Sequence, residues 1–481
     1  MTRTPLRDRS ADLLAVLAAA LLVLVAVLVG RHIQDTYRTL FVHWPPVFAD
    51  WDPHVGPGTP AALLVAAAVV AYGPGLAVRL PWRGLLAAAW GTCLAWTWSL
   101  ALVDGWQRGV AGRLTSPNEY LTVIGRFHDI PATLRDFTHH IVSGTPAPWP
   151  AHIAGHPPAA TLTFVLLDRI GLRGGGWAGA WCITVGSTAC VAVLVAVRAL
   201  AEERLARRAA PFLVLAPAAV WVGASADGYF AAVAAWAVAL LALAVTGRGV
   251  GWAAGAGLLY GLTCYLSYGL TLFALIGAAV LVLGRHRVRE RPVVLALLLV
   301  AGAAVVPVAF TLAGFDWWEG YRLLVTRYYQ GVGGTRPYGY WVWANLACTV
   351  LITGPATVAG LRRAGATLIH HRKSPSASAT PFASSVPSVP SVPSVPSVPS
   401  VPSVPSVPSA RTRLAFLVAV TLLALLIADL SGMSKAETER IWLPFAMWLL
   451  PACAFLPRPR VWLTGQALLA LLLNHLLFTG W

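Results

Sequence analysis

Charged residues are scarce in this sequence of 481 residues. Asp, Glu, Lys and Arg make up only 11% of it, 57% of the residues are hydrophobic, and the mean hydropathy is +0.69. Soluble globular domains carry roughly 25% charged residues, so this composition excludes that class. The uncharged runs 13–30, 84–103 and 174–197 are each long enough to cross a hydrocarbon core of about 30 Å. The sequence therefore predicts an all-α, polytopic membrane protein.

Cysteine motifs are also absent. All six cysteines fall in apolar runs, with no CxxC pair and no metal-ligand spacing, which indicates packing residues. The net charge of +16 comes from short arginine clusters between the apolar runs and not from one basic face, so nucleic acid is not an expected partner. A cleaved signal peptide is not expected, because the first apolar run is too long and many more follow.

The arginine clusters set the expected orientation. Positive residues favour the cytoplasmic side, and every cluster falls there when the N-terminus is cytoplasmic. Abundant Arg, Ala, Val and Leu beside very few lysines are typical of a GC-rich bacterial genome, so we expect the protein to lie in a bacterial plasma membrane. With the N-terminus cytoplasmic and about 13 spans, we expect the C-terminus to be extracytoplasmic. The pattern predicts about 13 transmembrane helices, at 13–30, 60–78, 84–103, 177–197, 209–224, 228–246, 251–267, 269–284, 292–314, 341–360, 412–429, 441–456 and 461–479.

The acidic residues segregate to the other face. Of the 19 acids, 14 lie outside or at outer span ends, and the five inside are Asp8, Asp12, Glu202, Glu203 and Glu290. Acids contribute little to topology, so this asymmetry needs another reason. Function on the extracytoplasmic face is one.

Four regions follow from these spans. Residues 1–83 hold two N-terminal helices, and 84–360 form a transmembrane module whose outer loop is 104–176. Residues 361–410 are a low-complexity Ser/Val/Pro linker in the cytoplasm, with a proline at every third position of its repeat, and 411–481 hold three C-terminal helices. Within the outer loop, 155–172 is too short an apolar run to span, so we interpret it as a re-entrant or interfacial helix on the outer side.

Asp227 is the only charged residue between Ala209 and Gly247. The span boundaries place it in the tight turn between two helices at the outer surface. Because Asp-Gly is a common turn pair, a plain turn residue is one interpretation. A site residue is the other.

The outer loop is richer in polar residues than a connector needs. Its candidate ligands for a substrate are Asp104, Glu119, Asp129, His152 and His156. The pairs His139-His140 and His152-x3-His156 suit Zn or Mn in principle, but no conventional metal motif accompanies them.

Two further outer segments carry cations among aromatic residues. The segment 315–341 holds Arg322 and Arg327, and 431–445 holds Lys435, Glu439 and Arg440. An aromatic belt with interfacial cations is the simpler interpretation. Cations at this face run against the positive-inside bias, however, and the planar fork of arginine suits phosphate. Together the outer segments predict a site for a sugar on a lipid phosphate.

The order of these features resembles the GT-C superfamily of integral-membrane glycosyltransferases, whose members include polyprenyl-phosphate-sugar-dependent bacterial mannosyltransferases. The resemblance rests on an Asp that opens a large outer loop, the "HPP" of His156–Pro158, an Arg-rich turn "RALAEERLARR", the outer Asp227, and "AETERIWLPF", which is similar to a "GEVERIW"-type segment. It covers 84–250 and the segment near 440. Two extra helices before the module, and a single acid in "VDGW" where a DD or DE pair is common, depart from the pattern.

The resemblance implies inverting transfer of a sugar from a polyprenyl-phosphate donor to a glycan, lipid or protein acceptor on the extracytoplasmic side. It implies Asp104 as the catalytic base and Asp227 as an orienting residue, metal ligand or alternative base. Arg440, with Lys435, Arg322 and Arg327, would bind the lipid phosphate. Some GT-C enzymes hold a divalent metal on acidic residues, and the sequence leaves this cofactor open.

Two other classes of protein compete with this hypothesis. A transporter or flippase for a lipid-linked or small polar substrate would suit the many spans, but transporter sites usually lie near the midplane and often come with inverted repeats. A non-catalytic membrane scaffold would need no outer acidic constellation.

Overall fold

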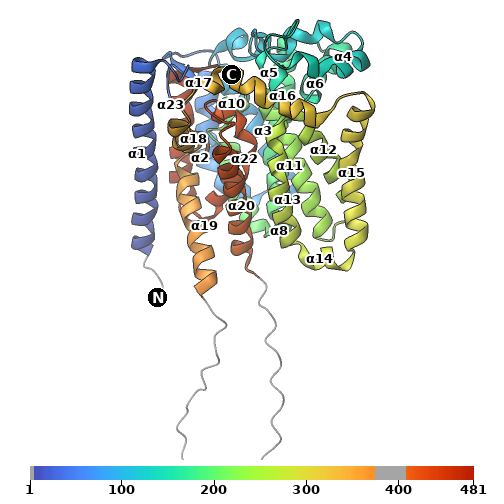
Figure 1. Cartoon of the computed structure of the whole chain (residues 1–481). Helices are drawn as coiled ribbons and strands as arrows, with labels where there is room; N and C mark the ends of the chain where they lie inside the picture. The colour runs from blue at the N-terminus through green and yellow to red at the C-terminus, as the bar shows by residue number, and fades with distance from the viewer. Residues whose placement is uncertain (1–4, 374–407, 481) are drawn as a thin grey trace, which may run out of the picture.

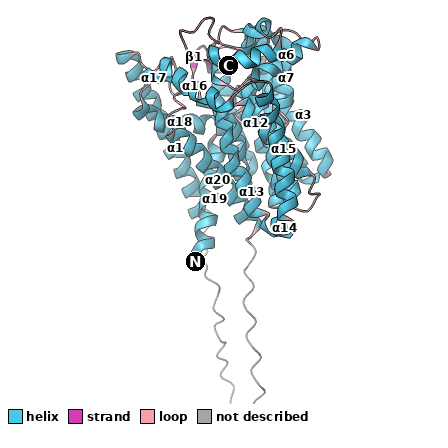
Figure 2. Ribbon diagram, turned by 45° about the vertical axis from the view of Figure 1, so that its right-hand side comes forward, coloured by secondary structure: helices cyan, strands magenta, loops and turns pink. Residues whose placement is uncertain are grey.

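The computed structural model describes residues 5–373 and 408–480. Most of these residues lie in helices, and the longest helices run side by side as a bundle (Figures 1 and 2). The all-α, polytopic architecture predicted from composition is confirmed.

Within the described residues, six helices are long and apolar enough to cross a membrane. Helices α1 and α15 stand at opposite flanks of the bundle in Figure 1 and expose most of their apolar side chains, as lipid-facing helices do, whereas α11 is mostly buried. The six are α1 (Pro5–Tyr37), α2 (Thr59–Arg79), α7 with α8 (Gly175–Gly186 and Ala189–Leu200), α11 (Ala226–Val245), α15 (Pro292–Leu312) and α20 (Ala410–Leu430).

The expected count of about 13 spans is not confirmed. The run 209–224 ends as a helix at Val214, because Pro217 cannot continue it, and 441–456 is divided into short helices with Pro444 and Pro451 near their starts. The remaining helices of the bundle are α3 (Trp82–Ala101), α9 (Glu203–Val214), α10 (Ala219–Val222), α12 (Trp252–Leu266), η5 (Tyr268–Leu272), α13 (Phe273–Leu283), α21 (Thr438–Ile441), α22 (Leu443–Leu449), η6 (Leu450–Phe455) and α23 (Pro459–Leu476).

The expected span 341–360 is not one continuous helix. Helices α18 (Tyr338–Thr353) and α19 (Pro355–Lys373) meet at 108°, with Gly354 in the left-handed region at φ 80°. The side chain of Gln466 accepts from the amide of Ala356 and donates to the carbonyl of Thr353, so it satisfies the backbone groups that the break leaves open. A Cβ at position 354 would lie 1.9 Å from Gln466 Oε1, which explains the glycine.

The linker starts later than expected. Helix α19 continues past residue 361 to Lys373, so the first part of the region 361–410 is helical. Residues 374–407, which include most of the Ser-Val-Pro repeat, lie outside the described residues.

The two ends of the bundle differ in character. One end of the bundle holds the start of α1, helix α14 (Arg285–Glu290), the C-terminal end of α19 and the start of α20 (Figure 1). The other end holds the loop helices and the C-terminus (Figure 1). The loop helices are η1 (Gln107–Ala111), η2 (Arg113–Thr115), η3 (Tyr120–Arg126), α4 (Ile130–Asp136), η4 (Phe137–His140), α5 (Ala151–Gly155), α6 (Ala159–Arg169), α16 (Trp317–Gln330) and α17 (Val332–Thr335). Helix α6 has 11 residues and is about 16 Å long, too short to span, which agrees with an interfacial or re-entrant segment.

A two-stranded sheet joins distant parts of the chain at the loop end. Strand β1 (Ala49–Trp51) pairs antiparallel with β2 (Leu477–Thr479), with Asp50 opposite Phe478. It fixes the connection between α1 and α2 against the C-terminal segment. The amide of Gly58, in the same connection, donates to the carbonyl of Leu102 at the end of α3.

Candidate active site

Asp227 is a buried helix-start residue and not the tight-turn residue that the sequence suggested. It lies in the first turn of α11, where Ser225 caps the helix by accepting a hydrogen bond from the Asp227 amide at 3.2 Å. A carboxylate is favourable there because the helix dipole is positive at its N-terminus. Its Oδ2 lies 2.8 Å from Nη1 of Arg440, which comes from the short helix α21.

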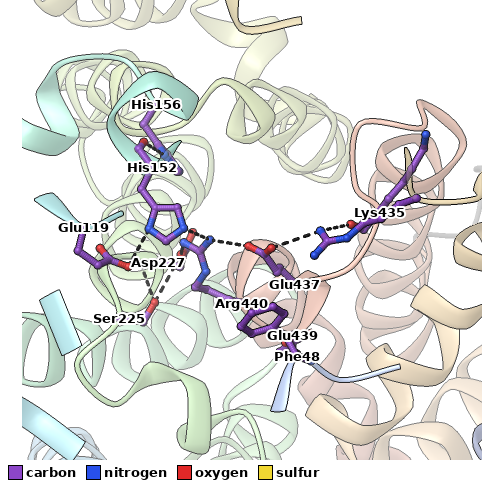
Figure 3. A network of polar contacts seen from close by, with 11 residues as sticks. Phe48, Glu119, His152, His156, Ser225, Asp227, Lys435, Glu437, Glu439 and Arg440 are labelled. Atoms are coloured by element: carbon purple, nitrogen blue, oxygen red, sulfur yellow. Dashed lines mark hydrogen bonds and ion pairs between the residues drawn. The ribbon is translucent and has the colours of Figure 1, made fainter. Parts of the chain in front are cut away.

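Arg440 connects this pair to further acids (Figure 3). Its Nη2 lies 3.3 Å from Glu437 Oε2 and 3.3 Å from His152 Nε2. Burial lowers the pKa of Arg440, but Asp227, Glu437 and Glu119 outweigh burial and raise it above its usual value. The guanidinium is therefore a permanent cation in this network.

His152 links Arg440 to Glu119. Because a guanidinium only donates hydrogen bonds, Nε2 of His152 accepts from Arg440, and the ring proton sits on Nδ1, which donates to Glu119 Oε1 at 2.7 Å. Burial raises the pKa of Glu119, but His152 and Arg440 more than offset this and hold it below its usual value. Glu119 is therefore ionised at neutral pH.

Three residues in the left-handed backbone region flank this network. Ala224 has φ 56°, Ala436 φ 71° and Glu437 φ 61°, and none of them is glycine. Such conformations cost on the order of 1–3 kcal/mol each and cluster at functional sites. Here they set the position of Ser225 on one side and of Arg440 on the other.

Asp104 forms a second cluster, just past the end of α3. His54 Nε2 lies 2.8 Å from its Oδ1, and Arg113 Nη2 lies 2.9 Å from its Oδ2. Arg113 also donates to the carbonyl of Thr479, at the end of β2. The side chains of all three residues of this Asp104 cluster are largely buried.

A small cavity separates the Asp104 cluster from the Arg440 network. Its volume of about 10 Å³ is enough for about one water molecule. Three of the residues around it carry a buried polar atom that has no hydrogen-bond partner among the described residues: Arg113 Nε, Glu119 Oε2 and Tyr120 Oη. The cavity is lined by Arg113, Leu114, Glu119, Tyr120, Ala224, Ser225, Ala226 and Arg440.

These unpaired atoms point to an occupant. A buried polar group without a partner costs about 1–3 kcal/mol, and three such groups around one cavity would be costly. A water molecule, or a hydroxyl or phosphate oxygen of a ligand, would satisfy them. The cavity can thus present two guanidinium groups and an ionised carboxylate to a polar ligand.

The site carboxylates do not fit a metal ion. Asp104 and Asp227 each bind a guanidinium, and no group of three metal-ligating side chains occurs in the part of the chain that the structure describes. His139 and His140 both bond to Asp136 at the surface.

Several predicted ligands lie away from the cavity. Asp129 caps α4 by accepting from the amide of Ala132, and Arg322 is exposed on α16. Arg327 donates to the backbone carbonyl of Trp149, at 3.5 Å. His156 donates to the carbonyl of His152 and packs edge-on to Tyr120, so it contacts a residue of the cavity wall without lining the cavity itself.

Lys435 and Glu439 hold the segment around α21 in place. The ammonium of Lys435 donates to the carbonyl of Gly333 at 2.9 Å. Glu439 is fully buried and accepts from the amide of Phe48 at 2.9 Å and from the thiol of Cys348, and burial raises its pKa. Both residues lie beside Arg440 in sequence but point away from the cavity.

Several residues of the site were not predicted from the sequence, among them His54, Arg113, Tyr120 and Glu437. The same positive-inside argument that indicated Arg440 applied to Arg113, an arginine in the outer loop. His54 gave no signal, because it precedes the region that resembles GT-C enzymes.

Comparisons with known proteins give a limited answer. No protein-family model matches the chain, and no curated protein does. Two solved structures of an oligosaccharyltransferase from Archaeoglobus fulgidus are similar to it, one in complex with Zn and sulfate at 13% identity and one tethered to an acceptor peptide with an NVT sequon at 12%. Each match covers 80% of this chain with a TM-score of 0.36, and the chain spans about half of the solved chains, 53% and 55%. At these values the similarity assigns neither an activity nor a substrate, so function has to be argued from the chain's own residues.

Proposed function

We propose that this protein is a membrane glycosyltransferase that moves a sugar from a polyprenyl-phosphate donor to an acceptor hydroxyl on the extracytoplasmic face, by inverting single displacement. The observation that supports it most is the cavity between Arg113 and Arg440, two buried cations that carboxylates hold in place. Arginine forks suit a phosphate, and carboxylates suit proton transfer and sugar hydroxyls.

The reaction assigns a role to each group. As the acceptor oxygen attacks the anomeric carbon, its proton passes to the Asp104 carboxylate, and the bond from that carbon to the phosphate oxygen breaks. The polyprenyl phosphate leaves with the electron pair, and Arg113 and Arg440 stabilise its charge. Asp227 orients Arg440, and the unpaired Oε2 of Glu119 accepts a hydrogen bond from a sugar hydroxyl. The cavity must widen for this, since it now holds about one water.

A second cavity supports a lipid donor. It has a volume of about 210 Å³, an almost wholly apolar wall between α11, α12, α13 and α15, and two exposed alanines, Ala274 and Ala278, where it reaches the surface of the bundle. Its lining residues on α11 run from Ala234 to Leu241, about 10 to 21 Å along the helix from Asp227. A prenyl chain could enter from the bilayer while its phosphate lies at the polar cavity.

The orientation belongs to the same proposal. The loop end of the bundle carries the site and the C-terminus, and the opposite end carries the arginines of α14 and the start of α1 (Figure 1). By the positive-inside rule the loop end is extracytoplasmic.

Transfer from radiolabelled polyprenyl-phosphate sugars tests the function, with protein in nanodiscs and a panel of donors and acceptors. We expect Asp104→Asn to lower turnover by about 100-fold or more while donor binding persists, and Glu119→Gln mainly to raise KM. If Glu119→Gln instead abolishes kcat and Asp104→Asn does not, the two roles are exchanged. Loss of lipid flipping in vesicles, with no transfer from any donor, would favour a flippase.

A further inference from the structure

The connection between the first two helices, residues 38–58, reaches the proposed catalytic carboxylate. His54, from this connection, lies 2.8 Å from Asp104, and it is 50 residues earlier in the chain. This part of the protein precedes the module 84–360. Its contact with Asp104 is therefore a feature of this chain that the resemblance does not explain.

The backbone around His54 is fixed by its surroundings. The amide of His54 donates to the carbonyl of His475 at 2.8 Å, and the amide of Gly58 donates to that of Leu102 at 3.0 Å. A Cβ at Gly56 or at Gly58 would lie 2.0 Å from a backbone oxygen at the end of α3, so only glycine allows this close approach. The backbone contacts therefore fix the position of the His54 imidazole next to Asp104.

The hydrogen bonds of His54 fix its protons. Nδ1 faces the backbone carbonyl of Asp52, which can only accept, so Nδ1 carries a hydrogen. Nε2 faces Asp104 Oδ1 at 2.8 Å, and two acceptors at that distance would repel each other. A second hydrogen must therefore lie between Nε2 and the carboxylate.

The surrounding charges favour an imidazolium facing a carboxylate. Arg113 bonds to the other oxygen of Asp104 and stabilises its ionised form, and Arg108 bonds to the Asp52 side chain at 2.6 Å. The titratable and charged groups around the ring are thus Asp52, Asp104, Arg108, Arg113 and His475, whose own ring bonds to Thr59.

We propose that His54 is a positioning residue for Asp104, held as an imidazolium that, with Arg113, fixes both oxygens of the proposed base. This inference rests on the proposed function. Two cations around one carboxylate also leave the cluster with a net positive charge, which suits an anionic phosphate. Without a hydrogen on Nε2, that nitrogen would repel Asp104 Oδ1 and the carboxylate would no longer be held.

Rescue by a conservative variant tests this role. His54→Gln still offers an amide hydrogen to Asp104, so it should keep kcat within a few fold of the wild type. His54→Ala offers no hydrogen, so it should lower kcat by about tenfold or more while KM for the donor stays within about twofold. His43→Gln, which alters an exposed histidine of the same connection, is the matched control and should match the wild type.

A second readout does not depend on turnover. In ¹⁵N-histidine-labelled protein in nanodiscs, we expect an imidazolium signal at pH 7 that is absent from both His54→Gln and Asp104→Asn. A neutral ring in the difference spectrum, or a loss of kcat in His54→Gln as large as in His54→Ala, would overturn the inference. If no donor supports transfer, the proposed function fails while the ¹⁵N spectrum still decides whether His54 and Asp104 share this proton.

Discussion

Arg440 Nη1 lies 2.8 Å from Asp227 Oδ2, although 213 residues separate them in the chain. Both side chains are about 95% buried. This pair joins the first turn of α11 to the segment before α22. Arg440 lines the cavity together with Arg113. It is the contact that turns a lone acid in an apolar run into part of a site.

Breaking this pair should destabilise the protein strongly. Arg440→Gln leaves Asp227 buried without its cation, which typically costs about 3–5 kcal/mol. We expect a lower thermal midpoint in detergent, followed by tryptophan fluorescence, and a smaller loss in Arg440→Gln combined with Asp227→Asn than the two single losses together. Arg322→Gln, on the exposed face of α16, is the control. Additive losses would show that the two side chains do not interact.

His156 should make the protein sensitive to mild acid. Its ring packs against Tyr120 and Phe230, and burial lowers its pKa to about 4, with Asp227 opposing. The unfolded chain takes up this proton near pH 6.5, so the stabilising contribution is complete above pH 6.5 and is lost as the pH falls from 6.5 toward 4. The loss amounts to at most about 3 kcal/mol.

Thermal midpoints between pH 7.5 and 4.5 check this. His156→Gln should flatten the acid side of the profile, whereas His286→Gln, at an exposed position of α14, should leave it unchanged. An equally steep profile in His156→Gln would assign the acid sensitivity to other groups.

Filling the apolar cavity should affect long-chain donors only. Ala237→Phe places a ring among Phe273, Gly277 and Leu281, where the prenyl chain is proposed to lie. We expect KM for a long polyprenyl donor to rise by about tenfold, while a short-chain donor with the same phosphate and sugar is used as before. Ala18→Phe, on the exposed face of α1, is the matched control. An equal effect on both donors would contradict a tail site.

Chelation should not abolish transfer. Asp104 and Asp227 are occupied by guanidinium groups, so the proposed charge stabilisation comes from Arg113 and Arg440. We expect turnover in excess EDTA to stay within about twofold of the untreated enzyme. Loss of activity that Mg²⁺ or Mn²⁺ restores would instead give a metal the role assigned to the arginines.

Part of the candidate site could be predicted from the sequence. Asp104, Glu119, His152, Asp227 and Arg440 were all predicted, because isolated charges next to apolar runs are conspicuous in a membrane protein. Lys435 and Glu439 were predicted on the same grounds, but their side chains form hydrogen bonds away from the cavity. The direction of a side chain does not follow from its position in the sequence. His54 was not predicted, because its contact with Asp104 joins residues 50 positions apart in the sequence. Arg113 is only nine residues from Asp104, and the positive-inside argument that indicated Arg440 also applied to it.

The sequence by itself determined that the chain is all-α and polytopic, and that its acids gather toward one face, because these properties follow from local composition and span length. How the chain packs around the bend at Gly354, and which acid meets which arginine, were decided only by the tertiary structure. Those contacts join residues up to several hundred positions apart, and no local pattern of hydrophobicity or charge encodes them.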